Sequence, residues 1–78
     1  MNASEVKALL ESKIEGSQVT AQGEGCNFQV IVVAEAFEGL NTLKRQQLVN
    51  SHLQEAISSG AIHAITMKTY TPAQFESL

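Results

Sequence analysis

The feature that most constrains the fold is a nearly continuous apolar run at residues 28–34, FQVIVVA, in a chain of 78 residues. The run is rich in β-branched residues, which favour strands, and it is far too short to cross a bilayer. A strand of this composition needs cover on at least one face, so we expect it to be the central strand of a small sheet. A chain of this length allows one domain, so residues 1–78 must supply that cover themselves.

Two segments with apolar residues at helical spacing can provide it. The first is predicted to start at a cap on Asn2 or Ser4 and to end at Gly16. Its stripe consists of Val6, Leu9, Leu10 and Ile14. The second is predicted to start at Asn41 or Thr42 and to close at Gly60. Its predicted buried stripe consists of Leu43, Val49, Leu53, Ala56 and Ile57.

The other segments complete the pattern. Residues 17–21 predict a short strand, residues 22–27 a glycine-containing hairpin loop, and residues 61–70 a third strand. The connector at residues 35–40 is expected to place Phe37 in the core. A capping box of Thr71 and Gln74, with Pro72 at the first helical position, predicts a short last helix through Phe75.

The resulting order is α-β-β-α-β-α. Strands joined by a short loop pair antiparallel, whereas strands joined through a helix favour a parallel pair with a right-handed crossover. We therefore expect an α/β domain with a three-stranded mixed sheet and helices packed on one face.

This topology predicts that Cys26 and His63 share one edge of the sheet. Cys26 and Asn27 come directly before the second strand, and His63 opens the third. Thiolate and imidazole are ligands that zinc, copper and iron–sulfur clusters prefer. Two ligands are half of what a [2Fe–2S] cluster takes, so such a site would be shared with a partner. The alternative is that Cys26 is a small packing residue and His63 a solvated surface group.

Charge and cysteine content narrow the classes of function. The net charge is −3, which argues against a domain that binds nucleic acid mainly through its phosphates. The net charge does not exclude a local basic patch. Lys44 and Arg45 are the adjacent cations. We expect both side chains to be exposed, either for contact with a partner or with DNA, or simply as part of a solvated helix face. The single cysteine allows no intramolecular disulfide, and the N-terminal segment lacks the features of a signal peptide. We expect a cytoplasmic protein that is not inserted in a membrane.

Three blocks of the sequence resemble the BolA family, especially its YrbA/IbaG-like branch. They are FQVIVV at residues 28–33 leading into FEG at 37–39, KRQQLV at 44–49, and IHAITMKTYTP at 62–72. They occur in the family's order, and the resemblance extends over nearly the whole chain. It implies a fold similar to a class II KH domain.

The resemblance also implies a function. Proteins of this family partner monothiol glutaredoxins with a CGFS motif, and a [2Fe–2S] cluster bridges the two proteins. The glutaredoxin cysteine and glutathione supply ligands, and the position that His63 matches supplies a histidine. Relatives in this branch place a second histidine where this chain has Asn27, and Cys26 stands one residue earlier.

We therefore expect a non-enzymatic accessory protein for cluster trafficking or iron signalling, monomeric when isolated, with His63 and Cys26 as metal ligands. Asn27, Lys44, Arg45 and Lys68 are the candidates for contacts with a partner or with DNA. The alternative is a KH-like transcriptional regulator, although the Gly-x-x-Gly loop of KH domains is missing. A hydrolase or transferase would have to rely on Cys26 with His63, because no other nucleophile–base pair is evident.

Overall fold

The computed structural model describes residues 2–25 and 27–78. Its elements follow the predicted order, with one short 3₁₀ turn added in the connector. They are α1 (Ala3–Lys13), β1 (Gln18–Glu24), β2 (Asn27–Val33), η1 (Glu35–Phe37), α2 (Thr42–Ser58), β3 (Ala64–Tyr70) and α3 (Pro72–Glu76).

The three strands form one mixed sheet in the order β1-β2-β3, with β2 in the centre as predicted. β1 and β2 are antiparallel, and Glu24 is opposite Asn27. β2 and β3 are parallel, and Asn27 is opposite Ala64. Both β2 and β3 therefore start at the same edge of the sheet, which confirms the topology on which the site prediction rests.

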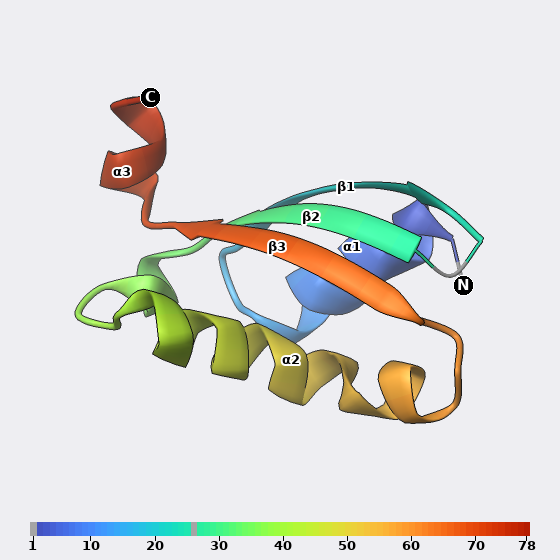
Figure 1. Cartoon of the computed structure of the whole chain (residues 1–78). Coiled ribbons are helices and arrows are strands. Elements are labelled where there is room, and N and C mark those ends of the chain that lie inside the picture. Colours follow the sequence, from blue (N-terminus) through green and yellow to red (C-terminus); the bar gives the residue numbers. More distant parts are fainter. Residues whose placement is uncertain (1, 26) are drawn as a thin grey trace.

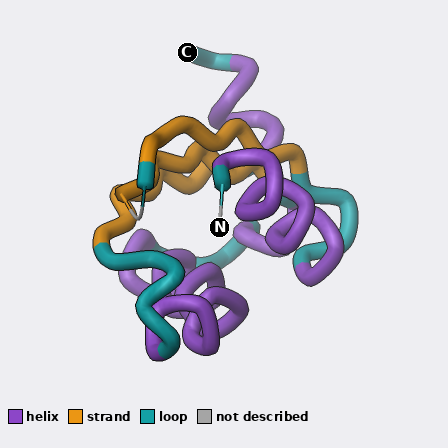
Figure 2. Tube along the Cα trace, turned by 90° about the vertical axis from the view of Figure 1, so that its right-hand side faces the viewer, coloured by secondary structure: helices purple, strands orange, loops and turns teal. Residues whose placement is uncertain are grey.

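Helices α1 and α2 cover one face of the sheet, here called the inner face (Figures 1 and 2). Alternate residues of β2 point into the core from this face, among them Phe28, Val30 and Val32, because side chains of a strand alternate between faces. Phe37 is fully buried, as the sequence predicted. The buried cluster consists of Val6, Leu10, Ile14, Val19, Phe28, Val30, Val32, Ala34, Phe37, Val49, Leu53 and Ile62.

The last helix takes a different position from the other two. The predicted capping box of Thr71 and Gln74 is present, with Pro72 in the first turn. α3 then leaves β3 toward the opposite, outer side of the sheet (Figure 1). There Phe75 packs near Tyr70, with 5.9 Å between ring centroids. Tyr70 is opposite Val33, so this contact helps to cover the outer face at one end.

Some predicted boundaries and burial assignments are wrong. Leu43 is 62% exposed and Ile57 40% exposed, because at 3.6 residues per turn both lie to one side of the helix face on which Val49 and Leu53 are buried. β1 continues to Glu24, so the predicted loop at residues 22–27 is largely strand. β3 starts at Ala64 rather than at residue 61, because Gly60 turns the chain at φ 83° and Ile62 enters the core first.

Of the helices that the structure describes, even the 17-residue α2 lacks the length and apolar character needed to cross a bilayer.

Candidate metal-ligand site at the strand starts

His63 directly precedes β3, and its side chain is exposed. The turn that positions it is fixed by its neighbour Ile62, which is 1% exposed and whose N–H donates to the carbonyl of Ala56 on α2. The backbone on one side of His63 is thus anchored in the core, and on the other side it enters the sheet. This arrangement holds an imidazole at the surface on a well-supported backbone.

Asn27 stands at the same edge of the sheet. It is the first residue of β2, it is exposed, and it is the register partner of Ala64, the residue after His63. Neighbouring strands lie about 4.8 Å apart, so Asn27 and His63 belong to one small surface region. Cys26, the second predicted ligand, lies outside the described residues.

Gly23 shapes this region and was not recognised from the sequence as part of it. It has φ +145°, and a Cβ there would collide with the carbonyl oxygen of Asn27 and come within 2.8 Å of Phe28 Cα. Only glycine lets β1 close onto β2 at this point, and a glycine inside a strand is the signal for such a close approach.

The outer face beside the strand starts is polar and open. A shallow depression there is lined by Gln22, Gly23, Glu24, Asn27, Phe28, Gln29, Ala64 and Thr66. Glu24 is the register partner of Asn27, so a carboxylate is close to the candidate site. Within residues 2–25 and 27–78, no group of three or more His, Cys, Asp or Glu side chains is placed to hold a metal ion.

The other predicted contact residues are not brought together with His63. Lys68 lies in the middle of β3 on the outer face, opposite Ile31. It is roughly 16 Å along the strand from His63, for a rise of about 3.3 Å per residue.

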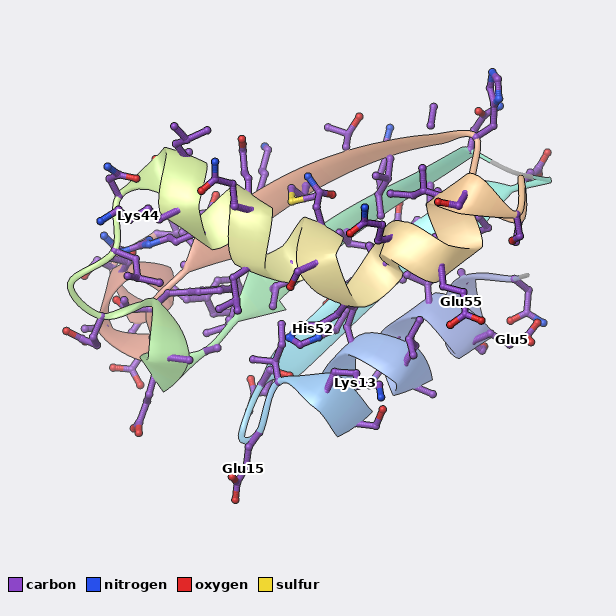
Figure 3. All side chains as sticks on the ribbon, turned by 90° about the horizontal axis from the view of Figure 1, so that it is seen from below. Glu5, Lys13, Glu15, Lys44, His52 and Glu55 are labelled. Atoms are coloured by element: carbon purple, nitrogen blue, oxygen red, sulfur yellow. The ribbon has the colours of Figure 1, made fainter. Side chains whose placement is uncertain are left out.

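Lys44 lies in the first turn of α2, at the other end of that helix from Glu55 (Figure 3). His52 lies midway along α2, half-buried, beside the end of α1 near Lys13 (Figure 3).

Arg45 has a structural role that the sequence did not reveal. Its Nε donates to the carbonyl of Leu40 at 2.9 Å, and its Nη1 donates to Gln74 Oε1 at 2.7 Å. The guanidinium carbon lies 5.8 Å from the centre of the Phe37 ring. Of the adjacent pair of cations, Lys44 is exposed as expected, whereas Arg45 is half-buried and is engaged within the chain.

Comparisons with known proteins agree with this architecture. The model of the BolA-like protein family matches residues 1–74. The chain belongs to the BolA family. It is 39% identical over 75 residues to the acid stress protein IbaG of Escherichia coli (strain K12), covering 96% of this chain and 89% of that protein.

Solved BolA structures are also similar to this chain. A bolA protein homologue from Coxiella burnetii has a TM-score of 0.89 at 35% identity, with 97% of each chain covered. BolA1 from Arabidopsis thaliana has a TM-score of 0.80 at 28% identity, with 92% of this chain and 93% of that one covered. The predicted family and the predicted BolA-like fold are thus confirmed.

Proposed function

We propose that this BolA-family protein is an accessory factor, not an enzyme, that partners a monothiol CGFS glutaredoxin in binding and passing on a [2Fe–2S] cluster. The observation that carries the proposal is the position of His63, which is exposed on an anchored backbone at the edge where β2 and β3 begin. An imidazole in this position is open to a ligand that a second protein presents.

The chemistry of the donor set supports a shared cluster. Histidine ligates one iron of some [2Fe–2S] centres, and such a cluster takes four protein or small-molecule ligands. His63 supplies one ligand, and we assign a second to Cys26, which precedes Asn27 in the sequence. The glutaredoxin cysteine and glutathione supply the remaining two. The cluster is thus a cargo held between two proteins.

Anaerobic cluster reconstitution with a CGFS glutaredoxin tests this proposal by visible circular dichroism. His63→Ala should abolish or strongly change the charge-transfer bands of the heterocomplex. His52→Gln is the matched control, since it removes the chain's other histidine and should leave the bands unchanged. An unchanged spectrum for His63→Ala would refute the assignment of this ligand.

Cys26→Ser separates the two proposed ligands in the same experiment. If its spectrum differs from the wild-type spectrum, the two-ligand site stands. If only His63→Ala changes the spectrum, Cys26 is not a ligand. If no heterocomplex forms with the wild-type protein, the partnership itself is wrong.

The alternative of DNA binding gains less from the structure. Phosphate contacts need cationic side chains that are free to reach the DNA backbone, and the counterions that the DNA then releases make binding steeply salt-dependent. The guanidinium of Arg45 is instead hydrogen-bonded to Leu40 and Gln74. Arg45 is therefore less available to a phosphate than the exposed Lys44 and Lys68, and this weakens the one adjacent pair of cations on which the DNA alternative relies.

A further inference from the structure

The free edge of β3 has a defined set of open backbone groups. β3 is the last strand of the sheet, so within residues 2–25 and 27–78 one of its two sides has no neighbouring strand. The carbonyl of Tyr70 points to the β2 side, because it accepts from the N–H of Ala34 at 3.0 Å. The carbonyl of Thr69 points the other way, since Arg45 Nη1 lies 3.5 Å from it.

Consecutive residues of a strand direct their backbone groups to alternate sides, so this pattern extends along β3. The N–H and C=O groups of Thr66 and Lys68 point toward β2, whereas those of Ile65 and Met67 point to the free edge. Arg45 occupies the Thr69 end of that edge. The open part of the edge is therefore the half that begins next to His63.

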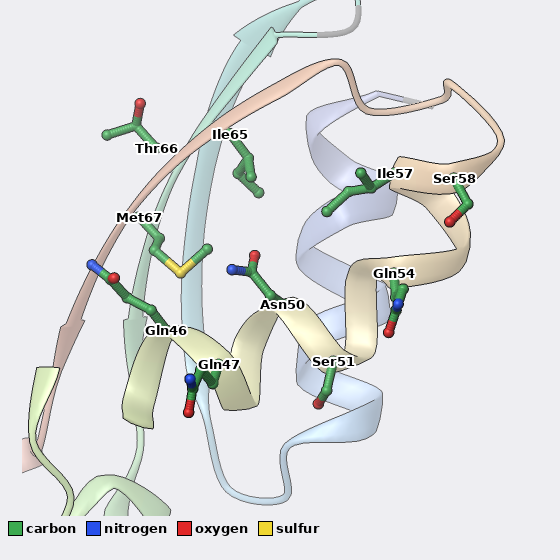
Figure 4. A pocket seen from close by; sticks show the side chains of 10 residues that line it. All are labelled: Gln46, Gln47, Asn50, Ser51, Gln54, Ile57, Ser58, Ile65, Thr66 and Met67. Carbon is green, nitrogen blue, oxygen red and sulfur yellow. The ribbon is translucent and has the colours of Figure 1, made fainter. Parts of the chain in front are cut away.

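A groove runs along this half, between β3 and α2. It is lined by Gln46, Gln47, Asn50, Ser51, Gln54, Ile57, Ser58, Ile65, Thr66 and Met67. Figure 4 shows Asn50 and Ile57 pointing from α2 toward Ile65 and Met67 of β3. The side chains of Ile65 and Met67 are only half-buried, so the inner layer is incompletely covered here.

The lining selects one kind of occupant. None of the described residues that line the groove carries a formal charge, so the groove supplies no cation to neutralise a phosphate backbone. Its α2 wall is rich in side-chain amides, which both donate and accept, and its other wall is an unpaired strand edge. An extended peptide matches both, because its main chain pairs with the edge while alternate side chains enter the groove.

We propose that the partner sharing a cluster with His63 adds an extended, uncharged segment to β3 as a fourth strand, with its inward side chains between α2 and the pair Ile65 and Met67. This inference rests on the proposed function and names the surface that the partner uses. The open edge begins two residues after His63, so one partner reaches both without spanning the molecule. The added strand supplies affinity and orientation, and the cluster joins the two proteins through its ligands.

Amide hydrogen exchange followed by NMR, with cluster-free CGFS glutaredoxin as the probe, tests the proposal. In the isolated protein, the N–H groups of Ile65 and Met67 should exchange much faster than those of Thr66 and Lys68. In the complex, Ile65 and Met67 should become protected at least about 10-fold, and Thr66 and Lys68 should change little. Complex formation without this alternating protection overturns the proposal and leaves the proposed function intact.

A pair of variants supplies the second measurement. Asn50→Lys places a charge in the groove at an exposed helix position, and Ala8→Lys places the same charge on the exposed side of α1. Asn50→Lys should raise the dissociation constant of the heterocomplex at least about 10-fold, whereas Ala8→Lys should not. Equal affinities would overturn the proposal. Absence of any complex with the wild-type protein would overturn both the groove and the proposed function.

A second copy of this chain is the competing occupant. If Ile65 and Met67 became protected in the isolated protein as its concentration rose, the edge would pair with another copy, and the proposal would be wrong. Protection that depends on the glutaredoxin alone supports it.

Discussion

Arg45 and Gln74 are joined by a 2.7 Å hydrogen bond that ties the first turn of α2 to α3, 29 residues later in the chain. The same Gln74 oxygen accepts from the N–H of Thr71 at 3.0 Å, so it belongs both to the cap of α3 and to the contact with Arg45. One amide thus couples the last helix to the body of the domain.

We predict that Arg45→Ala lowers the free energy of unfolding by about 1–3 kcal/mol, because the carbonyl of Leu40 and the amide of Gln74 lose their donor. Urea denaturation followed by circular dichroism measures the change. The control is Lys44→Ala, an exposed neighbour whose removal should change stability by less than about 0.5 kcal/mol. Equal effects of the two substitutions would contradict this role of Arg45.

Gly23→Ala should destabilise the protein by about 2 kcal/mol or more, because its Cβ would collide with the start of β2 and its φ of +145° is strained for alanine. Gly16→Ala is the control that measures the cost of a positive φ for alanine without a steric collision. Gly16 also has a positive φ, +73°, but a Cβ there meets no atom within 4 Å, so about 1 kcal/mol is expected. Thermal unfolding of the two variants compares them, and a smaller loss at Gly23 would show that the strands can separate there without cost.

Glu11 should make part of the stability depend on acidic pH. The ammonium of Lys7 and the N–H of Val19 both donate to Glu11 Oε2 and hold the pKa of this carboxyl below its ordinary value of 4.5. A carboxyl whose pKa is lower in the folded state stabilises the protein above its unfolded-state pKa, and this contribution is lost as the pH falls through the folded-state value.

Glu11→Gln should therefore lose less stability than the wild-type protein when the pH is lowered from 7 to 3. Urea midpoints across this range provide the measurement. Glu15→Gln removes the same charge just beyond the same helix and is the matched control. If Glu11→Gln and wild type had parallel pH profiles, the hydrogen bonds to Lys7 and Val19 would not be what stabilises the charged form.

Replacing His63 should impair cluster binding without lowering the stability of the fold. Because its side chain is exposed, His63→Ala is expected to change the free energy of unfolding by less than about 0.5 kcal/mol. Its neighbour Ile62 is 1% exposed, and Ile62→Ala should cost about 2–5 kcal/mol. Chemical denaturation of the two variants measures the contrast, and a large loss for His63→Ala would mean that any spectral change reflects misfolding.

The order of elements and the parallel β2–β3 pair could be predicted from local patterns. The apolar run at residues 28–34, the caps at Asn41 and Thr71, and the helical spacing of Val49 and Leu53 are all encoded within a few residues. Such patterns say which segments pair. They say less about where a strand ends. β1 continues to Glu24 through polar residues, which look like a loop in the sequence but are accommodated on the open outer face of the sheet.

The long-range contacts could not be predicted in the same way. Arg45 is adjacent to an exposed lysine in the sequence, but its acceptors on Gln74 and Thr69 come from distant segments that meet only in the folded chain. Leu43 and Ile57 belong to the predicted apolar stripe of α2, yet both lie beside the face that Val49 and Leu53 bury, and they stay exposed. At the candidate site, the pairing of Asn27 with Ala64 follows from topology, whereas the ligand role of Cys26 stays a prediction.

The direction in which the two chain ends leave the fold has a practical consequence. In Figure 1 the C-terminal helix α3 lies at the end of the molecule away from the starts of β2 and β3, whereas the N-terminal end of α1 lies on their side. The molecule is 33 Å along its longest axis. An affinity tag, a fluorophore or a surface tether joined after Leu78 would therefore leave His63 accessible, whereas one joined before α1 would leave the molecule on the same side as His63.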